Sequence, residues 1–195
     1  MKKHRANVFL ALGAAVMLAG CGSGKGEGTQ LRMACFPNIT HAQALVMKNG
    51  NILESKLGDE YEVTWNTFTA GSSEIEAIFA GEIDIGYIGP VPAINGNVKS
   101  EGDVTVIANA ADAGAVLVKG SASDIESVSD LAGKTVAIPQ IGNTQHLCLL
   151  NLLSENQLAP VSAGGTVEVV AVENANLQNM FDQGTVDAAL VPEPW

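Results

Sequence analysis

Basic residues are scarce in this sequence. It contains 10 lysines and arginines against 21 aspartates and glutamates, and its formal net charge is −11 at pH 7. Lys2, Lys3 and Arg5 fall at the very start of the chain, so the remainder is more acidic still. A surface of this sign repels nucleic-acid phosphates and anionic lipid headgroups. The composition therefore argues against nucleic acid, and against anionic lipid, as the main partner.

Cysteine is also rare. Cys21 ends an apolar run near the N-terminus, and Cys35 and Cys148 lie in two separate apolar segments. None of the spacings resembles the paired pattern of a zinc site. We expect Cys35 and Cys148 to be buried, unpaired thiols rather than a disulfide, and we expect no metal.

Sequence patterns typical of catalysis are missing. The chain contains neither a Gly-x-Ser-x-Gly elbow nor a His-Glu-x-x-His motif. His146 and Cys148 are two positions apart on a predicted helix, so they point to different faces and do not form a nucleophile–base pair. We therefore predict a protein that is not an enzyme, with no catalytic residues and no cofactor.

An export signal stands at the start of the chain. Residues 8–18 form an apolar run that is too short to span a bilayer but has the length of a signal-peptide core. The run ends in "LAGC", with small residues before Cys21, as a lipoprotein signal peptidase requires. We predict a signal peptide over residues 1–20, lipidation of Cys21 and a flexible, glycine-rich tether over residues 21–30. The mature protein would be anchored by lipid to the extracytoplasmic face of the cell membrane, or lie in the periplasm.

The rest of the chain contains an internal repeat. In each half an apolar strand leads through a polar turn to a helical segment, and a second strand follows that segment. These elements are expected at residues 31–37, 42–57 and 61–68 in the first half, and at residues 135–139, 147–158 and 167–172 in the second.

The third strand of each half begins in the same way. A helix stops at Gly81 or Gly184, and the next residues read Gly, any residue, β-branched apolar, Asp. We interpret the two aspartates, Asp84 and Asp187, as turn residues that anchor the third strand and leave them out of the site.

A β-α-β-α-β pattern that occurs twice predicts an α/β fold with two lobes, each a mainly parallel sheet flanked by helices. We place lobe 1 at residues 31–110 and lobe 2 at residues 111–191. A hinge at residues 109–114 joins them, and residues 192–195 start a return strand. No strand closes the first lobe after the return strand, so we expect its C-terminal part to be missing and the natural protein to be longer.

Polar clusters follow the strands of both halves, at the sheet edge where parallel sheets bind ligands and helices present free N–H groups. Each cluster alone is explained by helix capping, and we expect Ser73 and Asn176 to be N-cap residues, with Glu76 completing a capping box. Two lobes that face each other would bring the clusters together around a small ligand. The candidates are Asn38, Thr40, His41, Gly71, Ser72, Ser73, Gly89, Pro90, Gln140, Gly142, Asn143, Thr144, Gln145, Glu193 and Trp195.

Four segments are similar to motifs of a known family: "FPNITHAQALV", "AGSSEIEAIFAGEIDIGYIGPVPAI", "DLAGKTVAIPQIGNTQHLCL" and "GTVDAALVPEPW". The sequence resembles the nitrate, sulfonate and taurine branch of ABC-transporter substrate-binding proteins, which have the two-lobed type II periplasmic-binding fold. The resemblance covers nearly all of residues 31–195. It implies a monomeric, lipid-tethered receptor that captures a small solute between its lobes and delivers it to an ABC permease, and it implies that the candidate loops line the ligand.

The identity of the ligand stays open. A sulfonate or nitrate suits helix N-termini and needs no lysine, whereas Trp195 beside Glu193 suits a pyrimidine or thiamine-precursor-like heteroaromatic ring. His41 and His146 could each donate to the ligand or serve only as capping or surface residues. An enzyme that uses the same cleft, and a lipoprotein that merely scaffolds a membrane partner, remain as alternatives.

Overall fold

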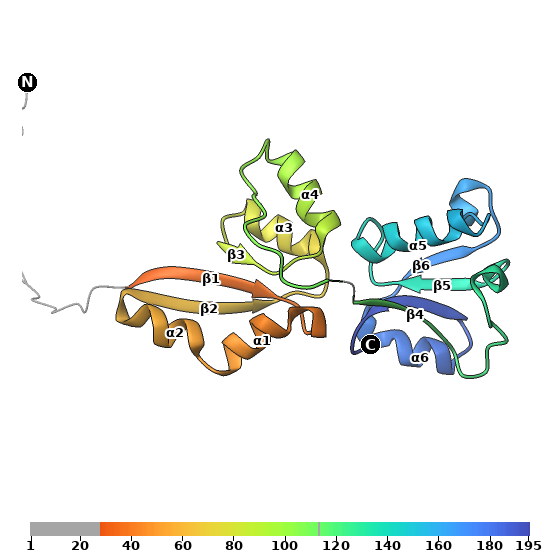
Figure 1. The fold of residues 1–195 in the computed structure, drawn as a ribbon, viewed down its shortest axis with the longest axis horizontal. Coiled ribbons are helices and arrows are strands. Elements are labelled where there is room, and N and C mark those ends of the chain that lie inside the picture. Colours follow the sequence, from red (N-terminus) through yellow and green to blue (C-terminus); the bar gives the residue numbers. More distant parts are fainter. Residues whose placement is uncertain (1–27, 113) are drawn as a thin grey trace, which may run out of the picture.

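The structure, a computed structural model, describes residues 28–112 and 114–195. Figure 1 shows two α/β lobes that lie next to each other along the long axis of the molecule. The first lobe holds a three-stranded sheet of order β2-β1-β3, and the second holds a four-stranded sheet of order β4-β7-β5-β6. The predicted two-lobed α/β fold is confirmed.

The first lobe is built around β1 (Thr29–Cys35), which pairs in parallel with both of its neighbours. Because the three strands run in one direction, their carboxyl ends meet at the edge that faces the second lobe (Figure 1). The other elements are β2 (Tyr61–Thr67), β3 (Ile85–Gly86), α1 (Ala42–Asn49), α2 (Ile52–Leu57), α3 (Gly71–Phe79), α4 (Pro90–Lys99) and the 3-10 turns Ile39–His41 and Gly58–Glu60.

The single helix predicted over residues 42–57 is wrong, because the segment forms two helices. Asn51 lies between α1 and α2 and has a φ of 48°, in the left-handed region. A helix does not continue through that conformation, which asparagine tolerates better than most residues. The break lets the chain bend along the sheet, and Trp65 of β2 donates its indole N–H to Glu54 of α2 at 3.3 Å.

The second lobe has a mixed sheet. β5 pairs in parallel with β6 and β7, whereas β4 runs antiparallel to β7 at the edge. Two apolar clusters fill its interior, one beneath α5 around Leu131, Leu149 and Leu153 and one beneath α6 around Leu177. The elements are β4 (Ala115–Lys119), β5 (Thr135–Ile138), β6 (Glu168–Ala171), β7 (Ala188–Pro192), α5 (Thr144–Glu155), α6 (Leu177–Asp182) and the 3-10 turns Val128–Leu131, Val161–Ala163 and Asn174–Asn176.

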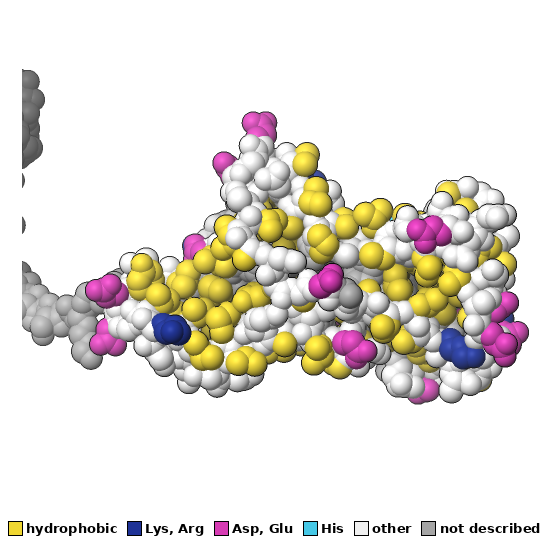
Figure 2. All heavy atoms as spheres, viewed as in Figure 1, with side chains coloured by type: hydrophobic (Ala, Val, Ile, Leu, Met, Phe, Trp, Pro, Cys, Tyr) yellow, Lys and Arg dark blue, Asp and Glu magenta, His cyan; other side chains and the backbone are white. Residues whose placement is uncertain are grey.

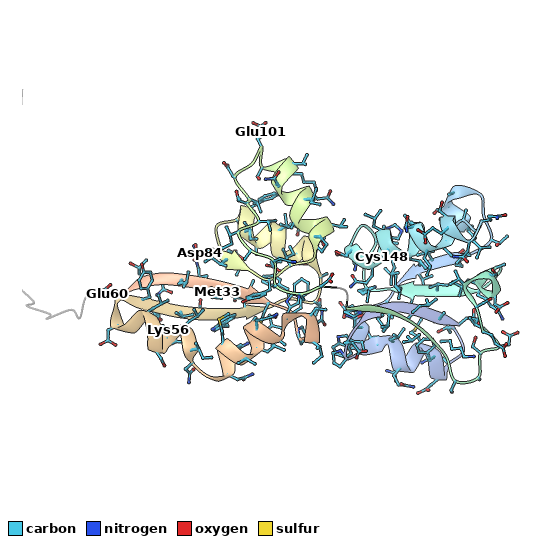
Figure 3. All side chains as sticks on the ribbon, in the orientation of Figure 1. Met33, Lys56, Glu60, Asp84, Glu101 and Cys148 are labelled. Carbon is cyan, nitrogen blue, oxygen red and sulfur yellow. The ribbon has the colours of Figure 1, made fainter. Side chains whose placement is uncertain are left out.

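The internal repeat is visible in matching hydrogen bonds. A carboxylate oxygen of Asp84 accepts the backbone N–H of Arg32 at 2.8 Å, and a carboxylate oxygen of Asp187 accepts that of Thr135 at 2.8 Å. Each aspartate therefore ties the third strand of its repeat half to the first strand of that half, β3 to β1 and β7 to β5, as predicted from the sequence. Asp84, which Figure 3 shows beside β3, also forms an ion pair with Arg32 at 2.7 Å.

Two predicted helix caps differ in the structure. α3 begins at Gly71 with Ala70 at the N-cap, so Ser73 lies inside the first turn and the predicted capping box does not form. Asn176 does occupy the N-cap of α6, but its side chain makes no capping hydrogen bond. Spacing alone located both helix starts to within a few residues and did not determine which side chain caps them.

One further expectation needs correction. Cys148 was expected to be buried, but it is exposed on the outer face of α5. Cys35 is buried and free, as predicted. Residues 104–107, which are mostly apolar, have no regular secondary structure, and Ile107 is exposed.

The predicted signal peptide (residues 1–20) and the lipidation site Cys21 lie outside the described residues. The predicted tether (residues 21–30) overlaps the fold, because Thr29 and Gln30 already belong to β1. None of the helices in residues 28–112 and 114–195 is both long and apolar enough to cross a membrane. The proposed lobe boundaries stay predictions, and β4, the first strand of the second sheet, opens at Ala115.

Candidate functional site

One pair of predicted site clusters meets between α3–α4 and the loop that enters α5. Gln140 Nε2 of the second lobe donates to Ser72 Oγ of the first lobe at 2.6 Å. The hydroxyl of Thr144 accepts the Val91 backbone N–H at 3.4 Å. The two lobes thus approach each other through small polar side chains and backbone groups.

A second pair meets where the chain returns from lobe 2. Trp195 Nε1 donates to Asn38 Oδ1 at 2.9 Å, and the backbone N–H of Ile39 donates to the carbonyl oxygen of Glu193 at 2.9 Å. The backbone N–H of Glu193 in turn donates to the carbonyl oxygen of Gly114 at 3.3 Å. The predicted hinge and the predicted return strand therefore lie together against the "PNITH" loop.

Two glycines make the approach of the lobes possible. A Cβ added to Gly89, the N-cap of α4, would lie 2.5 Å from the Thr144 hydroxyl oxygen. A Cβ added to Gly114, whose φ is +102°, would collide with the methyl group of Thr40. Any larger residue at Gly89 would push the N-terminus of α5 away from the first lobe.

His41 is folded into the first lobe. Its Nδ1 accepts the backbone N–H of Phe36 at 3.0 Å, and its ring stacks on Phe36 with centroids 4.7 Å apart. Burial lowers the pKa of His41 to about 4, so the ring is neutral at pH 7. Because Nδ1 is an acceptor, the neutral ring carries its proton on Nε2. His41 is therefore neither the surface residue nor the side-chain cap considered from the sequence, because it is buried and holds the backbone N–H of Phe36.

The N-terminus of α5 is capped by side chains of its own segment. Asn143 is the N-cap residue, and its Oδ1 accepts the backbone N–H of His146 at 2.8 Å. His146 Nδ1 accepts the backbone N–H of Gly142 at 3.1 Å. The oxygen of Asn143 is therefore occupied, and the interlobe contacts at this N-terminus come from Gln140 and Thr144. Gln145 lies beside them in the first turn of α5.

The start of α3 differs, because no side chain caps it. Ala70 at its N-cap has no polar side-chain group, and the first turn consists of Gly71, Ser72 and Ser73. The first N–H groups of a helix have no partner within the helix, so an uncapped start offers them to water or to a ligand. Ser72 and Ser73 are exposed there. Pro90, at the first position of α4, has no N–H to add.

Two cavities lie beside these contacts. One of about 210 Å³ is enclosed by α3, α4 and the loop before α5, and the predicted residues Ser72, Gln140, Gly142 and Asn143 line it. The other, of about 850 Å³, runs along α6 and the end of β4, and Trp195 lines it.

Positive charge is scarce where the lobes meet. On the face drawn in Figure 2, apolar and acidic side chains surround the junction, and no Lys or Arg side chain shows there. Within the described part of the chain, no group of three or more His, Cys, Asp or Glu residues is arranged to hold a metal ion. Lys99 is a cation that lines the smaller cavity, beside Gln140 and Gly142. Recognition of an anion at this junction would therefore depend on N–H and O–H donors, with Lys99 as a side-chain cation nearby.

Glu74 lies near the site and is not among the residues predicted from the sequence. Glu74, four positions after the N-cap of α3, has an exposed fraction of 0%. The sequence did contain a pattern that could have revealed it. Alignment of the two halves on Gly81 and Gly184 places Glu74 opposite Leu177, a core residue of the second lobe.

Comparison with known proteins identifies the family. The model described as the NMT1-like family matches residues 24–195. The chain belongs to this family. A protein of Escherichia coli (strain K12) that bears the name aliphatic sulfonates-binding protein is 28% identical over 152 residues, 77% of this chain and 46% of its own length. The taurine-binding periplasmic protein of the same organism is 31% identical over 134 residues, 68% of this chain and 39% of its own.

Solved structures of other proteins share the fold. The alkanesulfonate-binding protein SsuA from Xanthomonas axonopodis pv. citri, bound to MOPS, superimposes on this NMT1-like chain with a TM-score of 0.66 at 26% identity, covering 87% of this chain and 56% of its own. The periplasmic nitrate-binding protein NrtA from Synechocystis PCC 6803 gives a TM-score of 0.64 at 19% identity, and the match covers 87% of this chain and 48% of NrtA. This NMT1-like chain thus spans about half the length of the relatives it matches.

Proposed function

We propose that this NMT1-like protein is the solute-binding component of an ABC importer and that it captures a small oxyanion, such as a sulfonate or nitrate, between its lobes. The observation that carries the proposal is the uncapped first turn of α3, which faces the polar N-terminus of α5 across the interlobe contacts. Relatives named for sulfonates, taurine and nitrate support the ligand class.

The donor set fits an oxyanion held chiefly by N–H and O–H groups, with Lys99 lining the adjoining cavity. The N-terminus of a helix carries roughly half a positive charge, and its free N–H groups point along the axis toward the ligand. Ser72 and Thr144 add hydroxyl groups from the two lobes, and Gln140 adds an amide. A ligand that bridges these groups would hold the lobes closed, which is the motion expected of a two-lobed receptor.

Trp195 favours a second ligand class. The residue is 40% exposed, and its indole N–H already donates to Asn38, so the ring face rather than the N–H is available. A neutral or cationic heteroaromatic ring, such as a pyrimidine, could stack on that face, and a negatively charged protein does not repel it.

The remaining features follow from the same proposal. Lipidation at Cys21 would tether a monomeric receptor to the extracytoplasmic face of the membrane, near its permease. The receptor would release its solute unchanged, since the proposed site is not that of an enzyme and requires no cofactor. It would bind no nucleic acid.

A ligand screen with a matched pair of variants tests the proposal. The complete mature protein is screened by thermal shift against ethanesulfonate, taurine, nitrate, bicarbonate and a pyrimidine, and hits are measured by calorimetry. A ligand present at about one hundred times its Kd should add roughly 2.7 kcal/mol to the free energy of unfolding. If no compound in the panel binds, the proposed function is wrong for these solutes.

Ser72 permits a sharper test of the α3 donors. Ser72→Ala removes only the hydroxyl, whereas Ser72→Pro also removes the backbone N–H, and proline is tolerated in the first turn of a helix. A hydrogen bond to a charged group contributes about 1.5 to 3 kcal/mol, so we expect Ser72→Pro to bind an oxyanion at least tenfold more weakly than Ser72→Ala. Equal affinities would show that the α3 N–H groups do not hold the ligand, and a pyrimidine as the only hit would favour the second ligand class.

A further inference from the structure

Glu74 is a buried carboxyl group on α3. Its side chain has no exposed surface, and neither Oε1 nor Oε2 has a hydrogen-bond partner in the structure. The carboxyl group occupies the space above Gly86 of β3, where any added Cβ would collide with it. An unpaired buried polar group destabilises a fold, so its presence calls for an explanation.

The second lobe shows the apolar alternative at the same position. Ala34 pairs with Gly86 across β1 and β3, and Ala137 pairs with Ala189 across β5 and β7. In the second lobe Leu177 belongs to the same apolar core cluster as those two alanines. The fold therefore accepts a leucine and an alanine at these positions, whereas the first lobe has a glutamate, Glu74, and a glycine, Gly86, at the equivalent ones. This within-chain difference indicates that Glu74 is not needed for packing.

The surroundings of Glu74 leave its charge uncompensated. Burial raises the pKa of Glu74 to about 8, and no neighbouring charge is among the causes. On β1, Arg32 is paired with Asp84, the acid that precedes β3.

The remaining titratable groups on the surrounding elements are few. β1 also carries the Cys35 thiol, whose pKa burial raises above its ordinary value. Lys48 of α1 donates to Thr67 at 3.4 Å, Tyr87 follows β3, and Lys99 lies in the last turn of α4. Glu74 is the buried carboxyl group in this region, and burial raises its pKa to about 8, just above neutral pH.

We propose that Glu74 controls anion binding at the first turn of α3, because its neutral form leaves the helix N-terminus available to an oxyanion and its ionised form repels one. The inference rests on the proposed oxyanion-binding function. Side chains in a helix lean toward its N-terminus, and the carboxyl group of Glu74, three residues after Gly71, lies over Gly86, the last residue of β3, near the sheet edge where the ligand would bind. A receptor built in this way binds a permanent anion tightly at neutral and acidic pH and releases it as the pH rises.

Helix geometry sets the size of the effect. A rise of 1.5 Å per residue, plus the reach to the ligand, puts the carboxyl group roughly 7 Å from an anion at the helix start. Two negative charges at that distance repel each other enough to change the affinity about 10- to 50-fold at an effective dielectric constant of about 20. The same coupling requires the protein to take up protons when it binds the anion near the pKa of Glu74.

Calorimetry with ethanesulfonate across pH 6.5 to 9.5 tests the proposal in the complete mature protein. This probe keeps one negative charge throughout, so any pH dependence of the Kd belongs to the protein. We expect the Kd of the wild type to rise at least tenfold over this range, and Glu74→Gln and Glu74→Leu to vary less than threefold. Glu82→Gln, which removes an exposed charge after the far end of α3, should behave like the wild type.

Proton uptake provides a second readout. Near pH 8 in two buffers of different ionisation enthalpy, the wild type should take up protons on binding and Glu74→Gln should not. Parallel pH profiles for the wild type and Glu74→Gln, or equal proton uptake, would overturn the role of Glu74 and leave the receptor function intact. If ethanesulfonate does not bind the wild type but a pyrimidine does, the receptor function stands and this inference is wrong; if no solute binds, both are wrong.

Discussion

Replacement of Glu74 by glutamine should make the folded protein relatively more stable as the pH rises. Glutamine keeps the shape of the side chain and removes its charge. In the unfolded chain a glutamate has a pKa of 4.5, and burial raises the pKa of Glu74 in the folded state to about 8. The folded state therefore binds more protons than the unfolded state between these values, and the stability that neutral Glu74 permits is lost as the pH rises from 4.5 to 8.

The size of this loss follows from the two pKa values. One pKa unit corresponds to about 1.4 kcal/mol, so the contribution of Glu74 to the free energy of unfolding should fall by about 3 to 4 kcal/mol between pH 5 and pH 8. The usual depressed carboxyl pKa gives the opposite sign. Glu74→Gln does not titrate, so its stability relative to the wild type should increase by that amount over the same interval.

Urea unfolding at pH 5 and pH 8, followed by circular dichroism, measures the difference. The midpoint should shift without a change in the denaturant slope, because the area exposed on unfolding is the same. Glu82→Gln serves as the control and should follow the wild type at both pH values. If Glu74→Gln also follows the wild type, then Glu74 ionises normally in the folded protein and both the stability argument and the binding argument fail.

Three further changes test other parts of the structure. Asn143→Ala removes the N-cap of α5 and should lower the free energy of unfolding by about 1 kcal/mol in a urea titration, and an unchanged midpoint would contradict the observed cap. Gly89→Val places side-chain atoms against the Thr144 hydroxyl and should weaken ligand binding more than tenfold in calorimetry by holding the lobes apart, whereas unaltered affinity would show that this contact is dispensable. Cys21→Ser should release the protein from the membrane fraction on immunoblots while Cys148→Ser stays bound, and a Cys21→Ser protein that remains bound would refute the lipid anchor.

The repeat made the architecture predictable. Alternation of apolar strands with helical segments depends on local spacing, and Gly81 and Gly184 mark equivalent helix ends because both adopt a positive φ. The roles of Asp84 and Asp187 followed from their matched positions and are confirmed by their bonds to the first strand of each repeat half, β1 and β5. Local spacing was a weaker guide where a single residue decided the outcome, as at Asn51, which splits the predicted helix in two.

Individual side-chain roles in the site were harder to predict. Asn143, which was expected to face a ligand, also caps its own helix through its side-chain oxygen. Ser73 was expected to cap a helix and lies exposed within its first turn. The same residue types serve both purposes, since a hydroxyl or amide that follows a strand can bond either to the next turn or across the cleft. Which alternative is taken depends on the exact residue at which the helix begins.

The sequence by itself determined the order of strands and helices, the twofold repeat and the edge at which polar residues gather, because these depend on periodicities and turns that act over a few residues. Only the tertiary structure decided which of those residues touch across the lobes, as Ser72 and Gln140 do, and which turn inward, as His41 does. It also decided that Glu74 is enclosed without a partner. The burial of a side chain depends on contacts from segments that are far apart in the chain, here α3, β1 and β3. Burial therefore cannot be predicted from the neighbouring sequence alone.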